Sequence, residues 1–460
     1  MKLRLVLHLV WVALFLSSLA SCTAGRYGGR FFRRVLQSDI QDSPVFARGV
    51  TGFHLVDAAS GREICGVWAD KNFTPASNTK ILTLATCLAV LGDSLPGLEI
   101  VDRLLGGDEI RGGQEWVQAY FVTGTGDPTF LHPKFNAWQP VFQYLKKTGV
   151  ILLADPGKGP FSRFGAGWSW DDYSDDYSPE RSALPVFGNV VTLRREGERW
   201  EAYPRRFQDS LADMGAVAGT RPRVRRAEFS NQMEIQVPED RHAGFEAGVP
   251  VFQAGKLALT LLADTLGWPL PEMQTPWEVP AKRSYLYSVP VDTVYRRMMH
   301  QSDNFIAEQL LLMCAGVKLD TLDEARIIRW AQDSLFAGFP QPPRWVDGSG
   351  LSRYNLVSPR FLTTVLRKIY LEQPRERLFS LFPAGGVSGT LENWYAGPEG
   401  TPFVFAKTGS MGGVHCLSGY LLAKSGKVLI FSFMHNNFIG SNNAWKTEMQ
   451  RILRAIRERG

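Results

Sequence analysis

Residues 75–91 read PASNTKILTLATCLAVL and are followed by Gly92. The run after Lys80 is apolar almost all round, which predicts a helix that is buried in a core. Ser77 and Lys80 are three positions apart at its start and therefore share one face. We expect this helix to be a scaffold that presents a serine and a lysine at its N-terminus.

Ser77 and Lys80 could form a nucleophile and its base. A serine hydroxyl attacks only when a base takes its proton, and a lysine can be that base only if burial or a neighbouring cation lowers its pKa. The helix N-terminus adds N–H groups and positive potential that suit an oxyanion. The S-x-x-K pattern occurs once in the chain. Taken alone, however, it is more often a serine N-cap with a chance lysine.

A second short pattern, Ser302-Asp303-Asn304, separates two stretches of helical periodicity, Val291 to His300 and Phe305 to Ala315. This placement predicts a turn between two helices that points two polar side chains inward. In its general form, S-x-N, the pattern is weak, because Ser441-Asn442-Asn443 matches it too. That copy lies at the start of the final predicted helix.

A third pattern, Lys407-Thr408-Gly409-Ser410, follows an apolar strand from Phe403 to Lys407 and precedes another strand. We therefore expect Lys407 and Thr408 on a sheet edge that faces a cleft. Lys147-Thr148-Gly149 has the same letters but ends a helical stretch, where Gly149 is expected as a C-cap. Context separates the two copies.

S-x-x-K, S-D-N and K-T-G in this order are the signature of penicillin-binding proteins and class A β-lactamases. The chain resembles the D-alanyl-D-alanine carboxypeptidase/endopeptidase family, the class C low-molecular-mass penicillin-binding proteins. Four further stretches carry the resemblance, at 124–129 (GTGDPT), 167–172 (GWSWDD), 347–353 (DGSGLSR) and 384–391 (AGGVSGTL).

The resemblance implies an α/β fold. Its catalytic domain is expected to be similar to serine β-lactamases and D,D-peptidases, with an antiparallel sheet flanked by helices. The long interval between Ser77 and Ser302 implies a large inserted α/β region. We expect a first catalytic part at 43–94, the insertion at 95–284 and a second catalytic part at 285–460. A β-hairpin is predicted between Val50 and Ala69.

The resemblance also implies an acyl-enzyme mechanism on the D-alanine peptides of peptidoglycan, with β-lactam antibiotics as further ligands. Ser77 would attack the carbonyl between two D-alanines, and Lys80 would take its proton. Ser302 would relay a proton to the leaving amine. Asn304 would hold the substrate amide.

The K-T-G stretch would bind the substrate's terminal carboxylate. Lys407 would attract it and keep Lys80 neutral by like-charge repulsion, while Thr408 and Ser410 would contact it. The backbone N–H groups of Ser77 and Ser410 would form the oxyanion hole. No metal or organic cofactor enters this scheme.

Two stretches of the resemblance stay outside this catalytic set. The glycines of Asp347-Gly348-Ser349-Gly350 are expected to satisfy tight turns beside the cleft. The aromatic cluster from Trp168 to Tyr173 could be a sugar-binding platform or an aromatic hinge packed between domains.

Three rival functions remain open. A β-lactamase would need a positioned acid for deacylation, and no segment similar to E-x-x-L-N is seen where such an enzyme would carry it. A penicillin-recognising esterase shares the acyl-serine chemistry. A non-catalytic peptidoglycan-binding lipoprotein would not require Ser77, Lys80, Ser302, Asn304 and Lys407 together.

The N-terminus predicts export. Residues 1–22 combine a basic start with an apolar run too short to span comfortably, and Leu19-Ala20-Ser21-Cys22 resembles a lipobox. Cys22 is therefore expected to carry a lipid anchor on an exported, periplasmic lipoprotein; ordinary cleavage is the alternative. Residues 23–42 are expected to be a basic linker.

Charge and cysteines exclude other classes. The net charge is +6, but no array of Lys and Arg with interleaved aromatics indicates nucleic-acid binding. Cys65, Cys87, Cys314 and Cys416 show no metal-ligand spacing. Cys87 and Cys314 lie in apolar helical stretches, where buried free thiols are expected.

Overall fold

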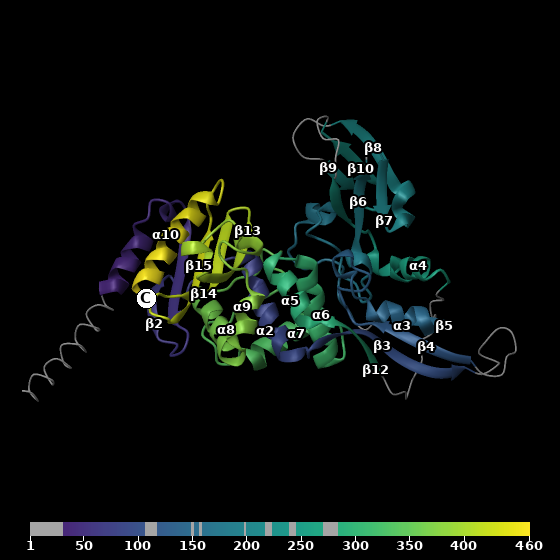
Figure 1. Cartoon of the computed structure of the whole chain (residues 1–460), viewed down its shortest axis with the longest axis horizontal. Coiled ribbons are helices and arrows are strands. Elements are labelled where there is room, and N and C mark those ends of the chain that lie inside the picture. Colours follow the sequence, from purple (N-terminus) through teal and green to yellow (C-terminus); the bar gives the residue numbers. More distant parts are fainter. Residues whose placement is uncertain are drawn as a thin grey trace, which may run out of the picture. The chain divides into compact units, whose positions relative to one another are not determined.

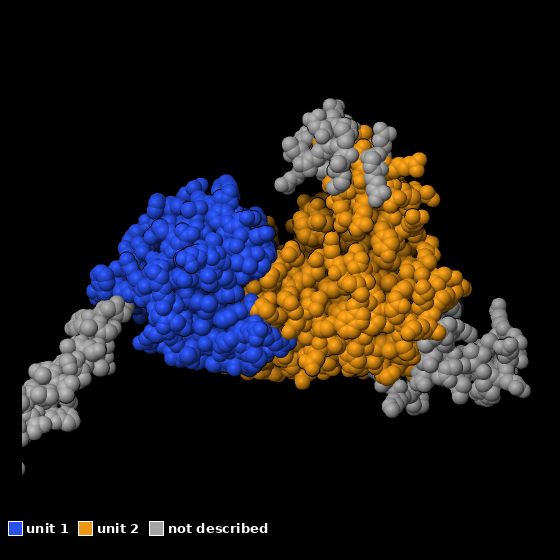
Figure 2. Space-filling view, viewed as in Figure 1, with its two compact units in different colours: residues 1–75, 357–379, 383–460 blue, residues 76–356, 380–382 orange. Residues whose placement is uncertain are grey.

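The computed structural model describes residues 31–105, 117–148, 151–155, 159–196, 199–216, 223–238, 245–269 and 284–460. The chain forms two compact units, which Figure 2 colours separately. Unit 1 comprises Met1–Pro75, Val357–Phe379 and Pro383–Gly460, and unit 2 comprises Ala76–Leu356 and Ser380–Phe382. This division differs from the predicted one, because residues 76–94 and 285–356 group with the expected insertion.

Unit 1 is built on one five-stranded antiparallel sheet of order β13-β14-β15-β1-β2 (Figure 1). Its strands are β1 (Val50–Asp57), β2 (Glu63–Val67), β13 (Val404–Met411), β14 (Val414–Leu422) and β15 (Val428–Asn436). The predicted hairpin is confirmed as β1 and β2. In its turn, the Asp57 carboxylate accepts the Ser60 N–H at 2.8 Å.

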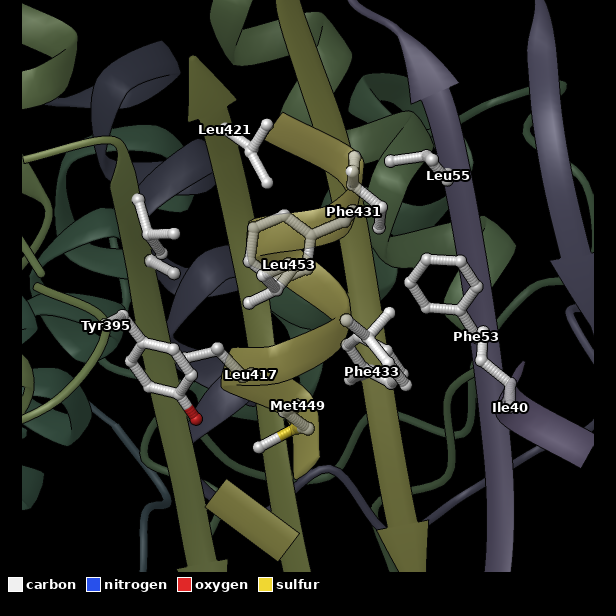
Figure 3. Packing of buried hydrophobic residues seen from close by; sticks show 14 of the residues in the cluster. Ile40, Phe53, Leu55, Tyr395, Leu417, Leu421, Phe431, Phe433, Met449 and Leu453 are labelled. Carbon is white, nitrogen blue, oxygen red and sulfur yellow. The ribbon is translucent and has the colours of Figure 1, made fainter. Parts of the chain in front are cut away.

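Successive side chains of these strands point to opposite faces of the sheet, and each face packs against a helix. Figure 3 shows Met449 and Leu453 of α10 (Asn443–Arg459) packed over Leu417, Phe431 and Phe433. The opposite face packs against α8 (Pro359–Glu372). Tyr420 donates its hydroxyl to the Leu366 carbonyl at 2.9 Å, and His54 contacts Thr363 at 2.6 Å. The predicted antiparallel sheet flanked by helices is confirmed.

Residues 31–41 are helical, so the described part of the expected basic linker is not a free tether. Leu36 and Ile40 are buried in the unit 1 core, and Phe32 packs against it. These three apolar residues recur at spacings of four and form one helical stripe, whereas the arginines point elsewhere. Residues 1–30, with the predicted signal and Cys22, lie outside the described residues.

Unit 2 contains the helices expected from periodicity. They are α2 (Lys80–Val90), α5 (Val291–His300) and α6 (Asn304–Leu319). A further helix, α7 (Glu324–Trp330), continues as a π-helical turn (Ala331–Leu335). A 3₁₀ turn, Ala76–Thr79, leads into α2. Cys87 on α2 and Cys314 on α6 are free and buried as expected, with their sulfurs 3.7 Å apart.

The rest of unit 2 is an α/β region that begins and ends in paired strands. β3 (Ser94–Leu105) pairs antiparallel with β12 (Ser284–Pro290), so the chain returns beside its point of departure. Three sheets, of order β12-β3-β4-β5, β11-β6-β7 and β8-β10-β9, contribute to one core with two helices. Their other elements are β4 (Val117–Gly124), α3 (Pro140–Thr148), β5 (Ile151–Asp155), β6 (Val190–Glu196), β7 (Arg199–Tyr203), β8 (Leu211–Ala216), β9 (Arg223–Arg226), β10 (Met233–Val237), β11 (Glu246–Pro250) and α4 (Ala254–Leu266).

Among the described residues, no helix has both the length and the hydropathy needed to cross a bilayer.

Candidate active site

Ser77 lies in the tight turn that starts α2 and is half-buried. The residue before it, Ala76, has a φ of +46°, a strained conformation for a residue with a Cβ. Gly350 closes over this turn with a φ of +87°, and a Cβ there would lie 2.0 Å from the Ala76 carbonyl oxygen. Only glycine fits this approach, so the 347–350 loop holds the serine turn in place.

Lys80 is completely buried, and its ammonium has three partners. Nζ lies 2.9 Å from Ser77 Oγ, 2.6 Å from Asn304 Oδ1 and 2.7 Å from the Ser349 carbonyl oxygen. These acceptors come from the start of α2, the start of α6 and the 347–350 loop. An amine has no more than three N–H donors, so the charged form is fully satisfied here.

Burial lowers the pKa of Lys80 from its ordinary value to about 8, because desolvation penalises the ammonium. The nearby carboxylates of Asp347, Glu308 and Asp303 act in the opposite direction and favour the charged form. The amine can therefore exist in both protonation states near neutral pH.

The Ser302-Asp303-Asn304 turn separates α5 and α6, as predicted. Ser302 has a φ of +58°, and Asp303 is the N-cap of α6, whose carboxylate accepts the Ile306 N–H at 3.1 Å. Asn304 turns toward Lys80, while its Nδ2 donates to the Tyr177 carbonyl at 2.9 Å. One N–H of this amide remains for another acceptor.

The 347–350 loop has a larger role than the turns expected of it. The Asp347 carboxylate accepts N–H groups of Gly350 at 2.9 Å and Ser352 at 2.6 Å, and Trp168 Nε1 at 3.0 Å. The loop so fixed supplies the Ser349 carbonyl to Lys80. Sequence reasoning missed this contact because it uses a backbone atom, which no side-chain motif reveals.

The aromatic stretch divides between two environments. The Trp168 indole supports the 347–350 loop, as just described, whereas Trp170 is 74 % exposed. The sequence predicts one aromatic cluster here, whereas the structure gives the two indoles different surroundings.

The K-T-G stretch lies in unit 1, within β13, an edge strand of the sheet. The expected sheet-edge position is confirmed, although the strand extends beyond Lys407 to Met411. Lys407 is buried and donates to the Thr408 carbonyl at 2.7 Å. Thr408 Oγ1 bonds Thr390 Oγ1 at 2.9 Å.

Ser410 is exposed at the end of β13, and its hydroxyl lies 2.8 Å from His415 Nδ1. Burial lowers the pKa of His415 to about 3, so its ring is neutral near pH 7. The second K-T-G copy differs, since Lys147 lies in the last turn of α3 and Gly149 is outside the described residues.

The structure thus brings Ser77, Lys80 and Asn304 into one hydrogen-bonded group in unit 2, with Ser302 at the adjoining turn. Lys407, Thr408 and Ser410 form a second group in unit 1. Within the part of the chain that the structure describes, His, Cys, Asp and Glu side chains nowhere gather in a set able to hold a metal ion.

Comparison with known proteins gives the chain a family. The model of the D-Ala-D-Ala carboxypeptidase 3 (S13) family matches residues 33–458. The D-alanyl-D-alanine carboxypeptidase of Actinomadura sp. (strain R39) is 26% identical over 441 residues, which is 87% of this chain and 80% of that protein. The D-alanyl-D-alanine carboxypeptidase DacB of Haemophilus influenzae is 31% identical over 176 residues, 35% of each chain.

The fold has a solved counterpart. The crystal structure of penicillin binding protein 4 from Haemophilus influenzae matches with a TM-score of 0.73 at 20% identity, covering 92% of this chain and 99% of that one. The predicted fold class is confirmed. The family expected from the three short motifs is confirmed as well: the chain belongs to the D-Ala-D-Ala carboxypeptidase 3 (S13) family.

Proposed function

We propose that this D-Ala-D-Ala carboxypeptidase cleaves peptidoglycan stem peptides or cross-links through an acyl-enzyme on Ser77. The observation that carries this assignment is the 2.9 Å contact between Ser77 Oγ and the amine of the fully buried Lys80. A serine beside a lysine whose pKa is lowered toward neutrality is an activated nucleophile.

The partners of Lys80 favour its role as the base. A neutral amine keeps two N–H donors, which the Asn304 and Ser349 oxygens accept at 2.6 and 2.7 Å. The remaining lone pair is then free for the proton of Ser77. The two carbonyl-type acceptors therefore orient the amine in the state that catalysis needs.

In the proposed reaction, Ser77 Oγ bonds to the carbonyl carbon between two D-alanines as its proton passes to Lys80. The carbon–nitrogen bond then breaks, and Ser302 relays a proton to the departing D-alanine amine. Water hydrolyses the resulting ester and frees Ser77. Asn304 binds the substrate amide through its remaining N–H.

We assign the substrate's terminal carboxylate to Lys407, Thr408 and Ser410. A cationic amine and two hydroxyl groups on one strand are suitable donors for a carboxylate. Thr390 and His415 support this assignment, since they hold the two hydroxyls in place.

Penicillins are proposed to acylate the same serine. Support comes from penicillin binding protein 4 of Haemophilus influenzae, a structure of which contains a β-lactam complex and matches with a TM-score of 0.64 at 20% identity. The protein is further proposed to work outside the cytoplasm, in the periplasm, held to the membrane by a lipid on Cys22. Its N-terminal sequence supports that placement.

Acylation of Ser77 is tested by intact mass. The wild type should gain the mass of one penicillin and keep it, whereas Ser77→Ala should gain none because it lacks the nucleophile. Ser441→Ala, in the second S-x-N pattern, should be acylated as the wild type is. An adduct on Ser77→Ala would overturn the assignment, and rapid release of the drug by the wild type would indicate a β-lactamase.

The pH dependence of acylation tests Lys80. With a Lys80 pKa of about 8, the acylation rate should rise with pH, reach half its maximum near pH 8 and level off above it, because only the neutral amine accepts a proton. Lys80→Arg, which stays protonated, should be unreactive throughout. Stopped-flow measurement of the acylation rate from about pH 6 to about pH 10 covers the range in which this amine should titrate. A flat profile, or a reactive Lys80→Arg, would exclude this base.

Carboxylate binding is tested with two substrates. Thr408→Val removes a hydroxyl that would donate a charge-assisted hydrogen bond to the substrate carboxylate. The kcat/KM for a D-Ala-D-Ala peptide should therefore fall by roughly tenfold or more. The same peptide with an amidated C-terminus should be affected much less. Thr447→Val, an exposed position on α10, is the control. Equal losses on both peptides would contradict a contact with the carboxylate.

Lipidation is tested on protein extracted from the membranes of a bacterium that processes lipoproteins. The wild type should carry a lipid-sized mass on a chain that begins at Cys22. Cys22→Ala should lack this mass and appear in the soluble fraction. An unmodified polypeptide mass for the wild type would refute the anchor.

A further inference from the structure

Glu308 is a charged side chain in the middle of an apolar helix. It lies on α6 within the sequence FIAEQLLLMCA (305–315), all of which is buried, and is itself 1 % exposed. Burying a carboxylate without partners is costly, so its contacts show what it serves.

Glu308 is linked to Lys80 through Ser349. Its Oε1 accepts the Ser349 N–H at 2.6 Å, and the carbonyl of the same Ser349 accepts from Lys80 Nζ at 2.7 Å. The loop lies tightly on α6 here, because a Cβ on Gly348 would be 2.7 Å from the Ala307 carbonyl. The position of one Lys80 acceptor therefore depends on the Glu308 carboxylate.

Arg181 supplies the opposite charge. It is fully buried, and its Nη1 lies 3.3 Å from Glu308 Oε2 and also pairs with Glu324. Its remaining N–H groups donate to the carbonyls of Ser162 at 2.9 Å and Phe164 at 3.1 Å. The guanidinium is thus fixed from both sides and favours an ionised Glu308.

The geometry points to a positioning role, and we propose that Glu308, paired with Arg181, sets both the place and the charge balance of Lys80 through Ser349. This inference rests on the proposed role of Lys80 as the base. It adds to the reaction a residue that touches neither Ser77 nor substrate.

The charges around Glu308 and Lys80 determine how Glu308 changes the pKa of Lys80. Asp347 and Arg181 face Glu308, whose pKa is raised by burial first and by Asp347 second, while Arg181 opposes the rise. Lys80 is faced by Asp347, Glu308 and Asp303, all of which stabilise its ammonium. Removing the negative charge of Glu308 should therefore lower the pKa of Lys80 further.

Two substitutions separate the effect of the Glu308 charge from the effect of its carboxylate position, and a third is the control. Glu308→Gln keeps an oxygen for the Ser349 N–H but removes the charge. Glu308→Asp keeps the charge but withdraws it by one methylene. Glu324→Gln is the matched control, because Glu324 pairs with the same arginine yet is not among the charges that act on Lys80.

The acylation rate is measured against pH for the wild type and the three variants, with thermal unfolding to confirm that each is folded. Glu308→Gln should move the rising limb of the profile to lower pH by roughly one unit. Glu308→Asp should leave the limb in place and lower its plateau on the order of tenfold, as expected of a misplaced base. Glu324→Gln should change neither.

A limb that stays in place or moves to higher pH in folded Glu308→Gln overturns the charge role. An undiminished plateau in Glu308→Asp overturns the positioning role, and this variant decides alone if Glu308→Gln does not fold. If Glu324→Gln shifted the limb as far as Glu308→Gln does, the specific role of Glu308 would be overturned, because the loss of either partner of Arg181 would have the same effect. Failure of the wild type to be acylated at all overturns the proposed function itself, an outcome distinct from these.

Discussion

The arrangement of unit 2 around Ser77 depends on one buried amine. Lys80 has no access to water and obtains every hydrogen bond from protein oxygens at 2.6–2.9 Å. Those oxygens lie on three segments that are distant in sequence, so each segment must be in place for the amine to be satisfied. The need to satisfy the hydrogen bonds of Lys80 thus fixes a helix start, an interhelical turn and a loop relative to one another.

The cost of burying that amine is offset in a cluster of alternating charges. Glu308 and Asp347 are buried and favour its ammonium, and Arg181 is buried against Glu308. Each of the three has polar partners of its own. Such clusters add little net stability, because desolvation consumes most of the Coulomb energy. Their effect is on geometry. Displacing one of these carboxylates would leave an unpaired charge in the interior, so the cluster restrains the 347–350 loop.

The sequence predicts the helices, the hairpin and the last strands well, because their apolar periodicity is strong and their ends carry turns. It also yields the candidate side chains for the proposed chemistry, since S-x-x-K, S-D-N and K-T-G are contiguous. It does not reveal Ser349, whose contribution is a carbonyl, nor Glu308, although a single acid within an apolar helix is a signal that could have been used. The sequence does not reveal the 31–41 helix, because its arginines obscure the stripe of Phe32, Leu36 and Ile40.

The central strand of the unit 1 sheet is the last one to be synthesised. β15 lies between β14 and β1, and Val50 pairs with Asn436. During synthesis the edge of β1 that pairs with β15 must therefore stay open while the whole of unit 2 is made. A chain cut short before β15 would therefore lose the middle of this sheet, and β14 and β1 would each keep an unpaired edge.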